Sequence, residues 1–326
     1  MGFKKFSADQ VLSLRVPCPG VKGHGSRQVV ILGMSDGSYE VFKSERRLRH
    51  SGAGISESKI SFNNSMYLMR AVTNAPKGRV VTKEEYFEFV SVASKKRYLF
   101  DDENERFVFN GMVAEHEKTS FLTRLEFVAG LKDLGHGATQ IEVASLLVKA
   151  LNNRWSKMAA SIGRLAAVDL FIGNYDRFTI DGDLNNPHNL FFAVEGGKLK
   201  ITGLDSFFDT GAHANFGLGL ETLHWGREMN LKALVKGSRE QRDYASSLTG
   251  SLNKELVGIL DGSDLARPNQ QGYLFPGVEV GFKIMGGMED GVKDLLSAIK
   301  SKRGVNKNPL QQGVFDRYDK LVSLRG

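Results

Sequence analysis

The chain has 326 residues, of which 41% are hydrophobic and 25% are charged. This length and apolar content suffice for one large domain or two lobes, each with a buried core. No apolar run approaches the roughly 20 residues of a transmembrane helix. The single cysteine, Cys18, excludes an intrachain disulfide and a cysteine-based zinc site, so we expect a protein of a reducing compartment, the cytoplasm.

The formal net charge is +7, which suits anionic ligands such as nucleotides, lipid headgroups or acidic proteins without distinguishing among them. The densest basic cluster, residues 46–50, lacks the interleaved aromatic side chains of a surface that stacks nucleic-acid bases. We interpret it as a solvated loop and expect no specific nucleic-acid partner.

The first part of the chain carries mostly strand signals. Val11–Val16 alternates between apolar and polar residues, and Gln28–Met34 is an apolar run. A turn signal at Ser35–Gly37 and renewed alternation over Tyr39–Lys43 follow, so we predict a β-hairpin over Val29–Lys43.

Short helices and further strands are expected next. Helical patterns cover Ser65–Asn74 and Thr82–Lys95, and the second opens with a capping-box pattern. Tyr98–Phe100 and Phe107–Glu115 have strand-like composition, with a charged turn between them. The N-terminal unit is therefore predicted to be rich in strands.

The pattern changes near Lys118, and we place the boundary between an N-terminal unit, residues 1–118, and a C-terminal unit, residues 119–326, at this point. Strand-like stretches at Asn189–Val194 and Lys198–Leu204, joined by a glycine turn, interrupt a largely helical region. The expected fold class is α+β, with a strand-rich lobe followed by a mainly helical lobe. Apolar residues three and four apart predict helices over Leu122–Leu134, Ala138–Asn152, Trp155–Phe171, Ser238–Leu260, Met288–Ser301 and Gln311–Ser323.

Two features of the N-terminal unit point to phosphate binding. Gly23, Gly25 and Ser26 lie in a flexible connection whose backbone N–H groups are able to approach a phosphate, although such connections are commonly plain turns. Lys43 ends a predicted strand on the same face as Val41, where its ammonium group could pair with phosphate oxygens of a nucleotide. A surface lysine at a strand end is the alternative interpretation.

The C-terminal unit carries a polar constellation. Asp176 follows an apolar helix in a tight turn, which makes it a candidate for orienting or deprotonating an acceptor hydroxyl. Its neighbour Arg177 could pair with an acidic side chain or a phosphate. Asn189 precedes one strand and Asp205 follows the next, so both lie at the same end of an antiparallel pair and could share one metal ion. Plain turn formation is the alternative for each.

These residues resemble the motifs of atypical kinases related to phosphatidylinositol 3- and 4-kinases and to HipA-type kinases. The resembling segments are Gly23–Ser26, Val41–Ser44, Asp169–Arg177, Asn189 and Leu204-Asp205. The resemblance implies a two-lobed protein-kinase-like fold, ATP with Mg²⁺ or Mn²⁺, and transfer of the γ-phosphate to a hydroxyl group.

The resemblance also implies roles for single residues. It makes Lys43 a phosphate ligand, Asp176 the catalytic aspartate, and Asn189 and Asp205 metal ligands. Phe109–Glu115 would form the strand and hinge against which adenine stacks, with Glu115 at the nucleotide.

Three departures from the pattern stand out. Phe178 replaces the usual histidine, Asp205 is followed by Ser206-Phe207, and the long gap after Asp176 leaves Asn185 or Asn186 as substitutes for Asn189. The helix glutamate that should pair with Lys43 also stays open among Glu57, Glu84, Glu85 and Glu88.

The sequence thus predicts an ATP-dependent phosphotransferase, with Ser or Thr of a protein favoured as the acceptor. A lipid headgroup is the alternative acceptor. A non-catalytic kinase-like binding module and transfer of AMP are the competing functions. A bacterial effector kinase delivered into a host cell is a further hypothesis, drawn from the compact size of the chain.

Overall fold

The computed structural model describes residues 3–17, 28–46, 54–73, 75–100, 102–135, 140–195, 198–203, 231–261, 263–264, 267–303 and 312–326. The chain forms two compact units. Unit 1 contains Met1–Asn63 and Pro76–Phe127, and unit 2 contains Asn64–Ala75 and Val128–Gly326. Helix α1 (Ile55–Val72) contributes its first half to unit 1 and its second half to unit 2.

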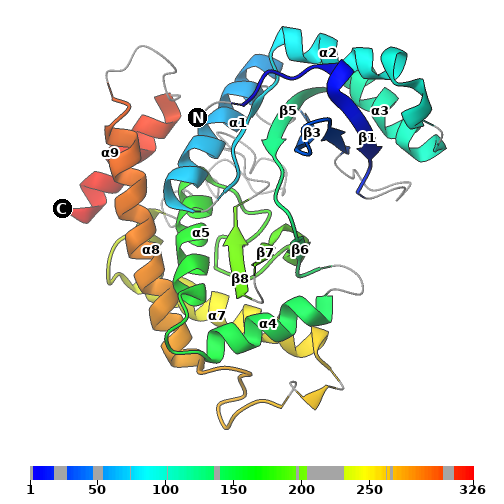
Figure 1. The fold of residues 1–326 in the computed structure, drawn as a ribbon. Coiled ribbons are helices and arrows are strands. Elements are labelled where there is room, and N and C mark those ends of the chain that lie inside the picture. The colour runs from blue at the N-terminus through cyan, green and yellow to red at the C-terminus, as the bar shows by residue number, and fades with distance from the viewer. Residues whose placement is uncertain are drawn as a thin grey trace. The chain divides into compact units, whose positions relative to one another are not determined.

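Unit 1 is built on a five-stranded antiparallel sheet with the order β1-β2-β3-β5-β4. Helices α2 and α3 lie beside this sheet in Figure 1. The strands are β1 (Val11–Arg15), β2 (Val29–Met34), β3 (Tyr39–Arg46), β4 (Gly78–Val80) and β5 (Ser120–Glu126), and the helices are α2 (Lys83–Lys95), α3 (Glu103–Glu115) and the short 3₁₀ turns η1 (Ala8–Gln10) and η2 (Arg97–Phe100).

A series of aromatic rings joins the elements of unit 1. Phe42 of β3 lies 4.9 Å from Phe6 and 4.7 Å from Phe89 of α2, measured between ring centroids. Phe89 in turn stacks on Phe109 of α3 at 4.5 Å. These pairs are in the range where aromatic contacts add to the free energy of burial. They fix both helices onto one face of the sheet.

The predicted hairpin of unit 1 is confirmed. Val29 pairs with Lys43 in the β2–β3 register, and Gly37 occupies the turn with a positive φ of 78°. The expected capping box of α2 is also present, because Thr82 and Glu85 exchange hydrogen bonds.

The strand expected over Phe107–Glu115 is wrong, since this segment is the second part of α3. Asp102 starts the helix by accepting hydrogen bonds from the N–H groups of Asn104 and Glu105. Phe109 and Met112, three residues apart, turn the buried face of the helix to the core. The buried side chains therefore follow helical spacing, although the composition of the segment is strand-like.

The helix expected over Leu122–Leu134 is also wrong. This region holds β5 and the short strand β6 (Leu131–Asp133). β5 pairs with β3 on one side and β4 on the other, and its residues 120–125 are all buried. A strand buried on both faces shows no alternation, so its sequence does not look like a strand. Because β5 belongs to unit 1, the boundary falls after Phe127 and not at residue 118.

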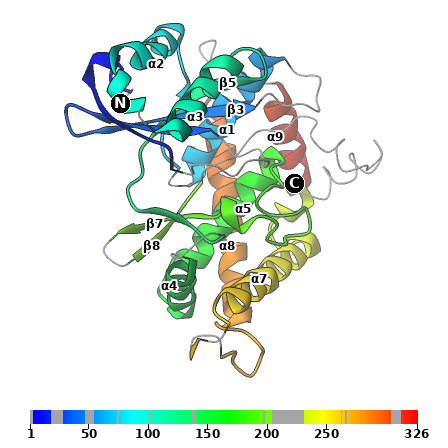
Figure 2. The ribbon, with the colours of Figure 1, turned by 90° about the vertical axis from the view of Figure 1, so that its right-hand side faces the viewer.

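Unit 2 combines a three-stranded sheet of order β6-β7-β8 with long helices. Helices α5 and α8 run side by side in both views (Figures 1 and 2). Their contact is close, because Gly163 lies against the carbonyl of Ile284 and Gly287 against that of Ala160. The further elements are β7 (Phe191–Glu195), β8 (Lys198–Thr202), η3 (Pro187–Asn189), α4 (Gln140–Asn152), α5 (Met158–Ile172), α7 (Arg239–Ile259), α8 (Gly277–Lys300) and α9 (Gln312–Arg325).

The β7–β8 hairpin was predicted and is confirmed, as are helices α4, α5, α7 and α9 within a few residues. α8 begins at Gly277, well before the predicted start at Met288. The predicted α+β class, with a strand-rich first unit and a mainly helical second unit, is confirmed. In the part of the chain that the structure describes, no helix combines the length and the apolar character needed to cross a membrane.

Candidate active site

The polar constellation of unit 2 begins where α5 ends. This helix is almost entirely buried and terminates at Gly173, whose φ of 76° is the left-handed conformation that glycine adopts easily. The N–H groups of Gly173 and Asn174 both donate to the carbonyl oxygen of Asp169. The chain therefore leaves the helix in a tight turn that holds the next residues in place.

A buried ion pair stabilises this turn. Arg177 donates through Nη1 to Oδ2 of Asp169, and the side chains are 0% and 1% exposed, respectively. Asn174 donates from Nδ2 to the other oxygen of Asp169 at 2.9 Å. A buried carboxylate needs such partners to stay ionised. Sequence reasoning did not assign Asp169 or Asn174 to the site, although a carboxylate inside an apolar helix already indicates a buried partner.

Arg177 also ties this turn to the start of the β7 region. Its Nε atom donates to the carbonyl oxygen of Asn189 at 2.7 Å. Arg177 is fully buried, so it pairs with an acidic neighbour, one of the two partners expected for it, and supports the residues on either side of the loop. Its contribution to the site is to position those residues.

Asp176 and Asn189 meet directly. Nδ2 of Asn189 donates to Oδ2 of Asp176 at 2.5 Å, and the Asp176 residue is exposed whereas Asn189 is buried. Among the described residues, no donor hydrogen-bonds to Oδ1 of Asn189. The pair thus presents a carboxylate and an amide oxygen side by side, which are ligands that Mg²⁺ prefers.

The two other asparagines lie nearby in different roles. Asn186 caps the η3 turn by accepting from the N–H of His188, and its Nδ2 atom lies 3.4 Å from Oδ1 of Asp176. Asn185 donates to main-chain oxygens, at 3.2 Å to that of Tyr175. Asn189 makes the short contact with the carboxylate, so the geometry favours it over Asn185 and Asn186 as the partner of Asp176.

Lys43, predicted at a strand end, lies inside β3 of unit 1 and is buried. Its Nζ atom lies 2.7 Å from Oε1 of Glu45, which is also buried. Residues two apart in a strand share one face of the sheet, which explains the contact. This partner is a strand residue and was not among the four helix glutamates considered.

Two of those glutamates are engaged elsewhere in unit 1. Glu85 accepts hydrogen bonds from Arg79 and from the buried Arg124. Glu88 accepts from the N–H of Ala8.

The expected adenine hinge at Phe109–Glu115 is not formed, because these residues are helical and Phe109 belongs to the core. Glu115 is the last residue of α3 and is exposed. Gly23, Gly25, Ser26 and Asp205 lie outside the described residues.

The donor atoms of this site fit a hard cation only in part. The described residues contain no group of three or more His, Cys, Asp or Glu side chains that could hold a metal ion. Of the two metal ligands expected from the sequence, Asn189 is described, and its amide group lies beside the Asp176 carboxylate. Mg²⁺ commonly keeps several waters and contacts substrate phosphates, so a single amide oxygen at this position suits a metal ion that is held jointly with a nucleotide.

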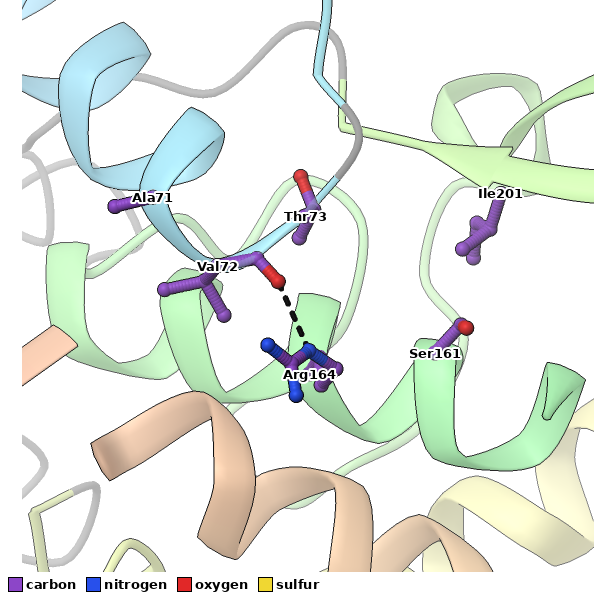
Figure 3. Close-up of a pocket in the computed structure, with 6 residues that line it drawn as sticks. All are labelled: Ala71, Val72, Thr73, Ser161, Arg164 and Ile201. Atoms are coloured by element: carbon purple, nitrogen blue, oxygen red, sulfur yellow. Dashed lines mark hydrogen bonds between the residues drawn. The ribbon is translucent and has the colours of Figure 1, made fainter. Parts of the chain in front are cut away.

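A separate pocket of about 240 Å³ lies in unit 2 at the end of α1 (Figure 3). There Nε of Arg164, on α5, donates to the carbonyl oxygen of Val72 at 2.9 Å. No predicted site residue lines this pocket; its lining residues are Ala71, Val72, Thr73, Ser161, Arg164 and Ile201.

No family model matches the chain, and no curated protein matches its sequence. Among solved structures, the kinase domain of maize sucrose-induced receptor kinase 1 bound to AMP-PNP is 12% identical, with 99% of this chain and 97% of that chain covered and a TM-score of 0.31.

The structure of the golgi casein kinase is 11% identical, with 92% of this chain and 74% of that chain covered and a TM-score of 0.30.

Proposed function

We propose that the chain is an ATP- and metal-dependent kinase that transfers the γ-phosphate to a hydroxyl group, with Ser or Thr of a protein as the favoured acceptor. The observation that carries this proposal is the exposed carboxylate of Asp176, hydrogen-bonded at 2.5 Å to the side chain of Asn189. The buried pair of Arg177 and Asp169 holds both residues in place. Phosphoryl transfer depends chiefly on such positioning and on charge stabilisation.

Each side chain has a distinct task in this proposal. Asp176 orients the acceptor hydroxyl and accepts its proton. Asn189 turns its Oδ1 atom to the metal ion, and Asp205 is the second protein ligand. When bound, the metal ion neutralises charge on the phosphate oxygens.

Four residues from the first part of the sequence are proposed to contact the nucleotide phosphates. Lys43 supplies a positive charge, and its contact with Glu45 orients the ammonium group. Gly23, Gly25 and Ser26 supply backbone N–H groups. Glu115 has no part in this proposal, because it lies at the exposed end of a helix.

The test is incubation of the pure protein with γ-labelled ATP and, separately, α-labelled ATP, each with Mg²⁺ or Mn²⁺. Wild type is compared with Asp176→Ala and with Asp181→Ala, which removes an exposed aspartate from the neighbouring turn. We expect γ-label to be transferred or released, with a loss of at least ~100-fold in Asp176→Ala. Asp181→Ala should retain wild-type turnover.

Three results would contradict the proposal. Transfer of α-label alone would indicate nucleotidyl transfer. An equal loss of ATP turnover in Asp176→Ala and Asp181→Ala would show that Asp176 does not have its assigned role. ATP binding that is absent or independent of metal would indicate a binding module. Protein acceptors and phosphoinositide vesicles are assayed in parallel, so that the acceptor class is decided in the same experiment.

A further inference from the structure

The segment that connects Asp176 to Asn189 contains a small hairpin with no part in the chemistry described above. Phe178 and Leu184 form an antiparallel bridge, and the N–H of Thr179 donates to the carbonyl of Asp183 at 2.7 Å. The turn closes at Gly182, whose N–H donates to the carbonyl of Thr179 at 3.1 Å. The segment is therefore ordered by its own hydrogen bonds.

One face of α7 holds this hairpin. Oγ of Ser251 accepts a 2.8 Å hydrogen bond from the N–H of Leu184, and Oγ of Ser247 donates to Oδ1 of Asp183 at 2.9 Å. Tyr244, Ser247 and Ser251 are spaced by three and four residues, so they lie on the same face of the helix.

Tyr244 makes the third contact through close packing. A Cβ atom at Gly182 would lie 2.5 Å from the carbonyl oxygen of Tyr244, and the φ of Gly182 is +94°. Only glycine fits at this position without displacement of the chain. The turn of the hairpin is therefore closely packed against α7.

The other end of the hairpin reaches the site itself. The N–H of Asn185 donates to the carbonyl of Arg177 at 2.9 Å, and its side chain donates to the carbonyl of Tyr175. These two acceptors flank Asp176 in the sequence. A displacement of the hairpin away from α7 would therefore be transmitted to the backbone on both sides of the proposed catalytic carboxylate.

We propose that α7 sets the position of Asp176 relative to Asn189 by holding this hairpin, and that Ser251 is a positioning residue for the reaction. The inference rests on the proposed function, since it assigns the pair a catalytic role. Ser251 is the most informative point to test, because it satisfies a main-chain N–H of the hairpin. Loss of that acceptor leaves a partly buried donor unpaired, which favours opening of the hairpin.

The experiment compares wild type with Ser251→Ala, Ser251→Thr and Ser246→Ala. Thr keeps a hydroxyl at the position, and Ser246 is an exposed serine of the same helix that makes no hydrogen bond from its side chain within the described residues. Hydrogen exchange is measured on peptides that cover residues 177–189. Turnover of γ-labelled ATP is measured over a range of ATP concentrations.

In Ser251→Ala, we expect exchange within 177–189 to accelerate by about tenfold, while peptides from α4 are unchanged. We expect kcat to fall by about tenfold with KM for ATP unchanged, because the loss affects alignment and not nucleotide binding. Ser251→Thr should restore both values substantially, and Ser246→Ala should match wild type.

Unchanged exchange in Ser251→Ala would overturn the inference whatever the activity. Faster exchange with unchanged kcat would also overturn it, since the hairpin would then be irrelevant to catalysis. A wild type with no turnover would count against the proposed function, and the exchange comparison would still decide whether α7 holds the hairpin.

Discussion

Asn189 and Asp176 are joined side chain to side chain by a 2.5 Å hydrogen bond, although they lie thirteen positions apart in the chain. This contact links the start of the β7 region to the turn after α5. It predicts that Asn189→Ala lowers kcat by about 100-fold and raises the Mn²⁺ concentration needed for turnover, because one metal ligand is lost and Asp176 is no longer oriented. Titration of turnover with Mn²⁺ measures both effects.

Asn185→Ala is the control for Asn189→Ala. Asn185 is exposed and its side chain contacts main-chain oxygens only, at 3.2 Å and 3.5 Å. We expect it to change the metal requirement little. An equal shift in the two variants would show that the choice of Asn189 is mistaken.

The buried pair of Arg177 and Asp169 predicts a strong effect on stability. Arg177→Met leaves the carboxylate of Asp169 in the interior without its cation, which should lower the free energy of unfolding by about 3–5 kcal/mol. The double variant Arg177→Met/Asp169→Leu removes the uncompensated charge and should recover much of that loss. Urea unfolding provides the measurement, and equal destabilisation of the single and double variants would contradict this explanation.

Lys43 is predicted to serve both the fold of unit 1 and the nucleotide. Lys43→Met should weaken ATP binding by at least ~10-fold, because a charge assigned to the phosphates is lost. It should also lower the melting temperature, because Glu45 stays buried without this cation. Calorimetric titration with ATP and a thermal melt measure the two effects separately.

A second substitution separates the two roles of Lys43. Lys43→Met/Glu45→Met removes both charges, so we expect the melting temperature to rise again while ATP binding stays weak. Recovery of ATP binding in the double variant would show that Lys43 has only a structural role.

Two adjacent glycines of α8 differ in their surroundings, so we expect substitution by alanine to affect the melting temperature differently at each. A Cβ atom at Gly287 would lie 2.0 Å from the carbonyl oxygen of Ala160, so Gly287→Ala forces α8 away from α5. Gly286 has no atom within 4 Å of such a Cβ, and Gly286→Ala should be neutral or stabilising by up to about 1 kcal/mol. Thermal melts of the two variants compare these effects directly. Similar melting temperatures would mean that the helices do not need this close contact.

Because of the buried side chain of His116, we expect the free energy of unfolding to decrease at acidic pH. Burial lowers its pKa below the ordinary value of 6.5, against the opposing effect of the Glu117 carboxylate. The imidazole is neutral in the fold, since Nδ1 accepts a hydrogen bond from the N–H of Leu122 at 3.2 Å. A histidine with a lowered pKa in the folded state binds its proton more readily when unfolded. The free energy of unfolding should therefore fall as the pH decreases through 6.5 toward the folded-state pKa.

Urea unfolding of wild type and His116→Gln at pH values of about 7.5 and about 5.5 tests this expectation. Glutamine does not titrate and its side-chain oxygen is able to accept the Leu122 hydrogen bond, so its stability should depend less on pH. The same pH dependence in both proteins would assign the effect to other groups.

The sequence anticipated the parts of the site that depend on local order along the chain. The apolar helix before Asp176, the tight turn after it and the hairpin that follows Asn189 were all recognised from spacing. The sequence did not show that Arg177 faces the interior, because the exposure of a side chain depends on which elements pack over the loop. The same reason applies to Lys43, whose charged partner on its own strand was overlooked among candidates from helices.

Local signals along the chain were sufficient to identify the β2–β3 hairpin with its glycine turn, the capped start of α2, and the order of polar residues from Asp169 to Asn189. Whether residues 107–115 and 120–126 are helix or strand depends on contacts that exist only in the folded chain. β5 is buried between two neighbouring strands, which removes the alternation that identifies a strand. In α3, Phe109 and Met112 both contact the core, and this contact selects the helical spacing.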